Sequence, residues 1–230
     1  MKIEPSKELA YWVGVVQSDG YVDIFYDKNR KIIYHRISVM VSKKSLSMLE
    51  KFQSISNSLL GSKVKIYKCK NEVFKCTLGA KRLLKFLENL NVKITDPPIP
   101  PKWVWNDDSL LGAYLAGLID GDGNINVRRS ERKCSIEIFS HCKQLHLQKL
   151  IRSRLKCGVW IRRLGNCYGI GFRVSHKNYK FIENFILPYL TIIHKNEKLK
   201  IFINEKRPVY MGLTTEGIIY NLNRRLANEV

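Results

Sequence analysis

Long hydrophobic runs are absent from this chain of 230 residues. No segment reaches the roughly eighteen consecutive apolar residues that identify a membrane-spanning helix, and the N-terminal stretch MKIEPSKE lacks the pattern of a secretory signal. We therefore expect a soluble, intracellular protein with no membrane partner, in the cytoplasm or, in a eukaryote, in the matrix of an organelle. At 45% of the chain, the hydrophobic residues still suffice for a real core.

Zinc-binding cysteine spacing is also absent. The six cysteines are too far apart for CxxC knuckles, and no histidine pattern completes them. They form the successive pairs Cys69 and Cys76, Cys134 and Cys142, and Cys157 and Cys167. In an intracellular protein they are expected to be reduced and mostly buried thiols. Only in a hyperthermophile would a pair such as Cys69 and Cys76 be expected to oxidise.

Acidic residues are scarce relative to basic ones. Twenty Asp and Glu stand against forty Lys and Arg, which gives a formal net charge of +20. The part up to residue 105 has 19 basic and 9 acidic residues and the rest has 21 and 11, so each part carries +10. A basic tail would concentrate the charge, whereas equal loading indicates that both halves contact one polyanion. Nucleic acid is the natural partner.

An internal repeat organises the chain. The stretch LAYWVGVVQSDG at 9–20 aligns with LGAYLAGLIDGDG at 111–123 at an offset of 103 residues. Small residues recur at every fourth position in both copies, namely Ala10, Gly14, Ser18 and Ala113, Gly117, Gly121. Residues four apart share one face of a helix, so each copy presents a stripe without large side chains. Two such stripes can pack with their backbones unusually close.

Each copy of the repeat ends in an acid, Asp19 in the first and Asp122 in the second. A carboxylate at a helix C-terminus opposes the helix dipole, and two facing carboxylates repel each other. A divalent cation between them would remove both penalties. The alternative is that Asp-Gly merely begins a turn after each helix.

The segment LAGLIDGDG at 115–123 differs by one residue from the signature of the LAGLIDADG homing endonucleases, and WVGVVQSDG at 12–20 resembles a diverged second copy. The resemblance covers nearly the whole chain. It implies an α+β fold of two pseudo-symmetric αββαββα repeats, whose antiparallel sheets form a DNA-binding saddle around two central motif helices. Gln17 replaces the first acid of the signature, but both copies keep the last acid, which is the one that binds metal in the family.

Periodicity predicts the same order of elements in each repeat. In the first we expect helices over 6–19, 45–60 and 79–90, with hairpins of 21–27 with 32–41 and of 63–67 with 73–78. Ser6 is the expected N-cap of the first helix. In the return strand, Ile33, Ile37, Val39 and Val41 are expected to face inward.

In the second repeat we expect a motif helix from about Ser109, hairpins of 125–129 with 134–139 and of 159–163 with 168–174, and helices over 145–155, 178–187, 195–205 and 213–226. The expected divisions are a first repeat at 1–94, a proline-rich linker at 95–108, a second repeat at 109–205, and a helical extension at 206–230.

The free faces of the two sheets are predicted to contact double-stranded DNA. A two-stranded ribbon fits the major groove, where Arg and Asn read base edges and lysines contact phosphate. The candidates are Tyr34, Arg36, Ser38, Lys65, Lys68, Lys70 and Lys75 in the first repeat, and Asn126, Arg128 and Arg173 in the second. The alternative for any single member is an ordinary solvated charge.

Magnesium suits two carboxylates, because it takes oxygen ligands, keeps several waters and binds substrate phosphate. We expect Mn²⁺ to substitute and Ca²⁺ to bind without turnover. The resemblance implies that the carbonyls of Ser18 and Gly121 join Asp19 and Asp122 as ligands. It also implies a basic or amide residue after the return strand, which maps to Lys43, and to His141 or Cys142 in the second repeat. A lysine after the last helix maps to Lys195, with Lys93 a poorer match.

The expected function is a monomeric, intron-encoded DNA endonuclease that makes a double-strand break in a long, non-palindromic target. Two binding functions remain as alternatives: a maturase that acts on intron RNA, and a non-cleaving DNA-binding regulator. A structural ribonucleoprotein component is a third. Retention of both acids favours cleavage, because a pure binder has no use for such a pair.

Overall fold

The structure is a computed structural model that describes residues 4–61, 63–79, 81–94, 97–128 and 133–210. The first repeat contains helix α1 (Lys7–Ser18), strands β1 (Gly20–Asp27) and β2 (Ile32–Ser42), a 3-10 turn (Lys43–Ser45), helix α2 (Leu46–Leu60), strands β3 (Ile66–Lys68) and β4 (Val73–Gly79), and helix α3 (Lys81–Asn89). Ser6 caps α1, because its Oγ accepts a hydrogen bond from the N–H of Leu9. The predicted N-cap is therefore confirmed.

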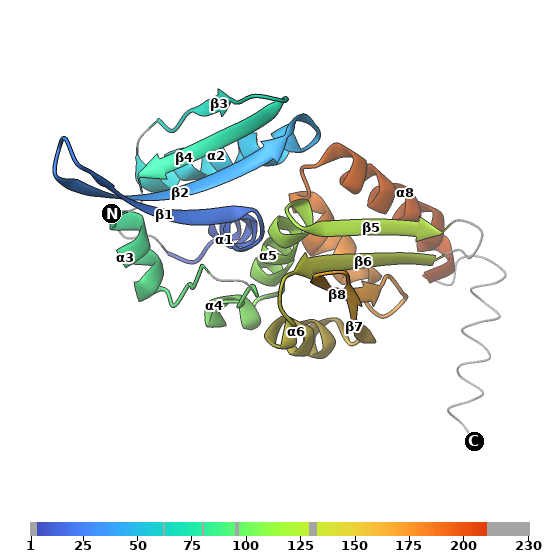
Figure 1. The fold of residues 1–230 in the computed structure, drawn as a ribbon. Helices are drawn as coiled ribbons and strands as arrows, with labels where there is room; N and C mark the ends of the chain where they lie inside the picture. Colours follow the sequence, from blue (N-terminus) through green and yellow to red (C-terminus); the bar gives the residue numbers. More distant parts are fainter. Residues whose placement is uncertain (1–3, 62, 80, 95–96, 129–132, 211–230) are drawn as a thin grey trace, which may run out of the picture.

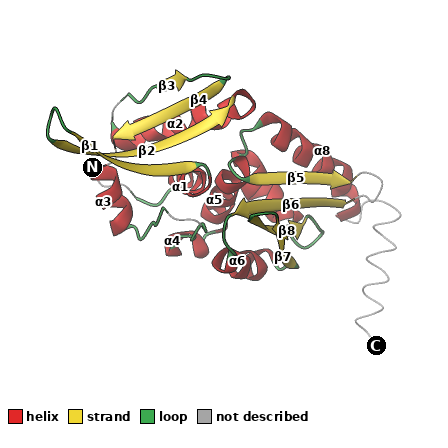
Figure 2. Ribbon diagram, in the orientation of Figure 1, coloured by secondary structure: helices red, strands yellow, loops and turns green. Residues whose placement is uncertain are grey.

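The second repeat follows the same course (Figure 2). It contains α5 (Asp108–Asp120), β5 (Gly123–Arg128), β6 (Lys133–Ser140), α6 (Leu145–Leu155), β7 (Val159–Leu164), β8 (Cys167–Arg173) and α7 (Tyr179–Phe181). A π turn (Ile182–Ile186) and a 3-10 turn (Leu187–Tyr189) lead to helix α8 (Ile193–Tyr210). The α+β fold of two related units is thus as predicted.

Two antiparallel four-stranded sheets flank the paired helices α1 and α5 (Figure 1). Their strand orders correspond, β1-β2-β4-β3 in the first and β5-β6-β8-β7 in the second. The registers correspond too, since Gly20 pairs with Val39 as Gly123 pairs with Ile138. This equivalence makes it possible to compare side chains between the repeats, position by position.

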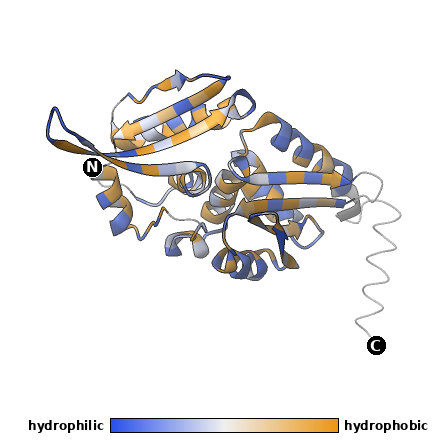
Figure 3. Ribbon diagram, viewed as in Figure 1, coloured by the Kyte–Doolittle hydropathy of each residue, from blue (hydrophilic) through white to orange (hydrophobic). Residues whose placement is uncertain are grey.

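Strand alternation separates a core face from an open face in each sheet. Ile37, Val39 and Val41 of β2 are buried, as predicted. Ile33 differs, with 55% of its surface exposed. The reason is that β4 pairs only with Arg36–Ser42 of β2, so Ile33 lies on a part of the hairpin that extends beyond the sheet. Figure 3 shows apolar and polar residues alternating along the strands and helices.

The segment predicted as one helix over 178–187 is instead a short α7 followed by the π and 3-10 turns. Pro188 explains the change, because it has no N–H to donate and its ring crowds the carbonyl four residues before it. The linker also differs from a plain extended connector, since Lys102–Trp105 forms the short helix α4. Strand β3 is shorter than predicted and begins at Ile66.

Helix α8 crosses the predicted division at residue 205 and continues to Tyr210. The helix predicted over 213–226 lies outside the described residues. Across the parts of the chain that the structure describes, no helix has both the length and the apolar character required to cross a bilayer. All six cysteines are free thiols, but only Cys76 and Cys134 are buried, so the prediction that most of them are buried is wrong.

Candidate functional site

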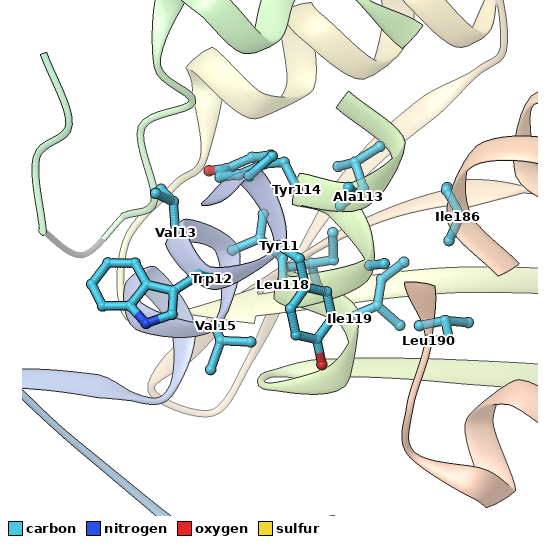
Figure 4. Close-up of a cluster of buried hydrophobic side chains, with 14 of the residues drawn as sticks. Tyr11, Trp12, Val13, Val15, Ala113, Tyr114, Leu118, Ile119, Ile186 and Leu190 are labelled. Atoms are coloured by element: carbon cyan, nitrogen blue, oxygen red, sulfur yellow. The ribbon is translucent and has the colours of Figure 1, made fainter. Parts of the chain in front are cut away.

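The helices α1 and α5 pack backbone to backbone at the centre of the molecule. A Cβ atom placed on Gly14 would lie 2.3 Å from the carbonyl oxygen of Tyr114, and one on Gly117 would lie 2.2 Å from that of Tyr11. Both positions therefore exclude any side chain. Figure 4 shows the tyrosines packed among the apolar side chains of the two helices. The predicted stripes of small residues face each other.

This packing places the two terminal acids at the same end of the helix pair. Asp19 is the C-cap of α1, and its N–H donates to the carbonyl of Val15. A Cβ atom on Gly121, the C-cap of α5, would lie 3.3 Å from Oδ2 of Asp19. Asp122 follows directly and is close enough to act electrostatically on Asp19.

Burial and the charge of Asp122 raise the pKa of Asp19 to about 7, while the charge of Lys195 lowers it. Removing a carboxylate from water disfavours its ionised form, and a second carboxylate adds repulsion. Without a bound cation, the site therefore holds more negative charge than its surroundings stabilise at neutral pH.

The donor set fits a hard divalent cation. Carboxylate and peptide oxygens are the ligands that Mg²⁺ takes, with waters and substrate phosphate completing its shell. Among the residues that the structure describes, no cluster of three or more His, Cys, Asp or Glu could hold a metal. A cation at Asp19 and Asp122 would therefore need carbonyl, water or phosphate oxygens as well.

Lys195, in the first turn of α8, reaches the end of α5. Its Nζ donates to the carbonyls of Ile119 at 2.7 Å, Asp120 at 2.9 Å and Gly121 at 3.3 Å. Burial lowers the pKa of Lys195, and the charges of Asp120, Asp19 and Asp122 raise it in part. The lysine neutralises the negative end of the α5 dipole. The structure thus brings this predicted residue to the paired acids.

Asp120 is an anchor that our sequence reasoning did not single out. It is only 1% exposed, and its Oδ2 accepts hydrogen bonds at 2.8 Å from the N–H and Oγ1 of Thr191 and from the hydroxyl of Tyr11. Its Oδ1 accepts from the N–H of Ile192 at 3.3 Å. Asp120 therefore holds the chain just before α8, which fixes where Lys195 can reach.

Gln17 occupies the position equivalent to Asp120 in the first repeat and is anchored in a similar way. Its Oε1 accepts a hydrogen bond from Tyr114 at 2.7 Å, and its Nε2 donates to the carbonyls of Lys93 and Ile99. Each repeat thus donates a tyrosine hydroxyl to the residue two positions before the terminal acid of the other motif. The alignment of Tyr11 with Tyr114 was the signal that could have revealed this reciprocal pair. Lys93 itself is exposed.

A second set of contacts joins helix α2 of the first repeat to the second repeat. Ser47 Oγ donates to the carbonyl of Thr191 at 2.8 Å, and Lys51 Nζ donates to that of Tyr189 at 2.8 Å. The ammonium of Lys51 also lies 3.8 Å from the centroid of the Tyr11 ring. Burial lowers the pKa of Lys51 to about 8. The loop before α8 is therefore held by α2 of the first repeat as well as by Asp120 of the second.

Lys43 is placed differently from Lys195. It lies in the 3-10 turn after β2, is well exposed, and its Nζ is 3.6 Å from Oε1 of Glu72. His141, by contrast, lines the same cleft as Asp122. That cleft has a volume of about 520 Å³ and also includes Ser18 and Cys167. Cys142 is not among the residues that line it, so of the two alternatives in the second repeat, His141 is the one at the cleft.

The open face of the first sheet carries several predicted DNA contacts. The rings of Phe25 and Tyr34 stack with their centroids 5.3 Å apart, and the Arg36 guanidinium lies 4.5 Å from the Phe25 centroid. Lys75 lies over the ring of Tyr21. Lys65 and Lys70 lie in the exposed segments flanking β3.

Two members of the predicted set do not offer their side chains for contact on this open face. Ser38 belongs to the face by strand alternation, but it is 1% exposed and shares a hydrogen bond of 2.8 Å with Thr77. Lys68 pairs with Phe74, which lies on the core face of the sheet, so the register places Lys68 on that face as well. At the sheet edge its side chain is nevertheless solvent-exposed. Burial by neighbours and the strand register, which the sequence pattern does not resolve, account for both differences.

The open face of the second sheet is hollowed into a pocket of about 260 Å³. The three predicted residues Asn126, Arg128 and Arg173 all line it. Glu137 and Arg162 line it as well, and neither was among the predicted contacts. Each repeat thus supplies one of the two terminal acids and one of the two polar sheet faces, so the single chain is folded as two matched halves.

Comparison with known proteins identifies the family. Residues 6–91 match a profile described as a LAGLIDADG-like domain, and residues 115–205 match one described as LAGLIDADG endonuclease. Together the two matches span most of the chain. The chain belongs to the LAGLIDADG family, as a member with two motifs.

Solved structures of low sequence identity share the fold. The homing endonuclease I-DmoI in complex with DNA and Mn matches with a TM-score of 0.57 and 16% identity, over 80% of this chain and 98% of that one. A K262A mutant of I-SmaMI matches with a TM-score of 0.51 and 18% identity, over 99% of each chain. At these identities, the likeness establishes the fold alone.

One curated protein also matches, a component of the A-type ATP synthase of Methanopyrus kandleri. It is 26% identical over 155 residues, which are 65% of this chain. The chain spans only 14% of the length of that protein.

Proposed function

We propose that this protein is a site-specific DNA endonuclease that makes a metal-dependent double-strand break in a long, non-palindromic target. The observation that carries the proposal is the pairing of Asp19 with Asp122, where burial and mutual repulsion raise the pKa of Asp19 to about 7. A fold has no stability reason to keep this pair, whereas a phosphodiester hydrolase needs oxygen ligands for a divalent cation.

In this proposal, Asp19 and Asp122 hold the cation together with the carbonyls of Ser18 and Gly121. A bound Mg²⁺ supplies an activated water and neutralises charge on the scissile phosphate. Lys195 holds the end of α5 in place through its three carbonyl contacts. We propose further roles for Lys43 and His141 in orienting solvent near the phosphate. Mn²⁺ should substitute for Mg²⁺, and Ca²⁺ should support binding without turnover.

The substrate in this proposal is double-stranded DNA, with one half-site on each sheet. The charge of each part of the chain, +10, suits contact with phosphate along the whole site. The structural neighbours include I-DmoI bound to DNA with Mn and I-SmaMI bound to an uncleavable DNA. Because side chains at equivalent positions differ between the sheets, the target should not be a true palindrome.

We further propose that the protein is a soluble, intracellular monomer encoded within an intron. A maturase that acts on intron RNA is the second candidate, because the same basic faces suit RNA phosphates. A regulator that binds DNA without cutting it is the third. Both alternatives leave the Asp19–Asp122 pair without a use, so substitution of these acids separates cleavage from binding.

The test is cleavage of a target selected from a randomised duplex library in Mg²⁺. Asp19→Asn and Asp122→Asn should each bind the target with unchanged affinity but cut at least about a hundredfold more slowly, because each loses a charged metal ligand. Glu50→Gln is the matched control, since Glu50 is exposed on α2. Cleavage of both strands by either aspartate variant at the rate of the control would refute the proposal.

A further inference from the structure

A carboxylate is buried on the open face of the second sheet. Glu137 of β6 is only 5% exposed, and its Oε2 accepts a hydrogen bond of 2.6 Å from Nη2 of Arg162 on β7. Among the described residues of β5 to β8, it is the one acid on this face, which otherwise carries neutral and basic side chains. On a surface that faces a polyanion, an acid is unfavourable unless it has a specific use.

The surroundings of Glu137 hold the ion pair in one geometry. In the register, Glu137 pairs with Gly171, which pairs with Trp160. A Cβ atom on Gly171 would lie 2.4 Å from the Trp160 ring, so the absence of a side chain allows the indole to lie across the sheet beside Glu137. The carboxylate is therefore shielded from water, while the Arg162 side chain remains 48% exposed and lines the 260 Å³ pocket.

We propose that Arg162 is a specificity-determining residue that reads a guanine in the major groove, and that Glu137 is its positioning residue. The inference rests on the proposed function, because it requires that this face contact duplex DNA. Arginine binds the O6 and N7 atoms of guanine through two parallel N–H donors, which is the commonest specific base contact. A guanidinium already held by Glu137 loses less side-chain entropy when it forms this contact.

The first repeat has no counterpart of this pair. The registers align Ile138, Ile170 and Ile161 with Val39, Cys76 and Ile66. Glu137 therefore corresponds to Ser38, and Arg162 to Tyr67. Because neither residue carries a formal charge at neutral pH, this guanine preference belongs to one half-site only. The chain thus reads an asymmetric target at this position.

The experiment measures duplex binding of the full chain in EDTA, so that no cleavage occurs. Each position of a selected target is changed in turn to all four bases. The wild type should prefer guanine by about tenfold at one position of one half-site. Arg162→Lys keeps the positive charge but lacks the two-pronged donor geometry, so the preference there should fall below about twofold, with other positions unchanged.

The neighbouring Arg163 offers a matched control. Its Nε donates to the carbonyl of Gly165, and it lies one residue further along β7, on the other face of the strand. Arg163→Lys should leave the whole preference profile intact. Glu137→Gln keeps an acceptor but loses the charge, so the guanine preference should weaken several-fold while affinity averaged over all four bases is kept or rises.

The outcomes separate this inference from the proposed function. If no duplex is bound with any sequence preference, the proposed function itself fails. If the wild type is selective but Arg162→Lys keeps the same profile, the reading role of Arg162 is overturned while the proposed function stands. If Glu137→Gln raises affinity equally for every base with unchanged discrimination, Glu137 only repels DNA and its positioning role is overturned. Thermal melts establish that each variant is folded.

Discussion

Asp19 differs from an ordinary surface acid because its ionised form is disfavoured in the folded chain. Its pKa is about 7 in the fold, against a usual value of 3.8. Between these two values the folded state binds more protons than the unfolded state, so this group makes the protein less stable as pH rises from about 4 to about 7. Above that range the penalty is constant.

Asp19→Asn removes this penalty. In EDTA, the variant should equal the wild type in free energy of unfolding near pH 4 and exceed it by about 1–4 kcal/mol above pH 7. Urea denaturation across this range measures the difference. Added Mg²⁺ should stabilise the wild type more than the variant, by about 2.7 kcal/mol at one hundred times the dissociation constant. A pH-independent difference between the two proteins would contradict this account.

For Asp120, which lies only two residues before Asp122, we expect the opposite effect: replacing it by Asn should destabilise the protein. Its carboxylate accepts four hydrogen bonds from residues 11, 191 and 192. Asp120→Asn replaces one acceptor by an amide that faces these donors, so the free energy of unfolding should fall by about 2–4 kcal/mol. Asp108→Asn, at the half-exposed other end of α5, should cost less than about 1 kcal/mol. Equal losses in both variants would show that Asp120 is no anchor.

At the scale of elements, the decisive feature is the contact between α1 and α5. Two glycines allow a backbone approach that no other residue permits, and the separation of the two terminal acids depends on this approach. The reciprocal tyrosine contacts and the loop before α8 then hold the helices in register. The metal site that we propose is therefore a property of the helix pair rather than of either helix.

Gly117→Ala tests this contact. The added methyl group would meet the carbonyl of Tyr11, so we expect a loss of about 3 kcal/mol in unfolding free energy, together with slower cleavage. Gly79→Ala is the control, because a Cβ atom at Gly79 meets nothing within 4 Å. That variant should change stability by less than about 0.5 kcal/mol. Equal tolerance of both substitutions would mean that the helices can separate without consequence.

At the scale of the whole molecule, the net charge of +20 is divided equally between the two parts of the chain. If both sheets contact phosphates, DNA binding should release many counterions. With six to ten such contacts, affinity should fall by about 10³–10⁵-fold between 50 and 200 mM salt. Fluorescence anisotropy against KCl concentration gives the slope, and an unrelated duplex should show a similar one. A slope near zero would show that the positive charge does not contact DNA phosphates.

Much of this architecture follows from the sequence by itself. The apolar periodicity and the Ser6 cap depend on residues close together in the chain, so they predict the helices and the sheets. The repeat at an offset of 103 matches two such local patterns, and their stripes of small residues predict the pairing of the two motifs. The predicted ends and burial of elements were less accurate where a local feature changed the regular pattern. Pro188 and the overhang of the β1–β2 hairpin are two such cases.

The tertiary structure alone decided which side chains surround the acids and which reach the open faces. Lys195 contacts α5 across more than seventy residues, Lys43 pairs with Glu72, and Glu137 holds Arg162 from another strand. Such contacts depend on how loops, registers and crossing helices bring distant residues together. The sequence determined that two acids meet at the centre of a basic, two-part molecule, because matched local patterns specify matched elements. The neighbours of those acids were decided only by packing.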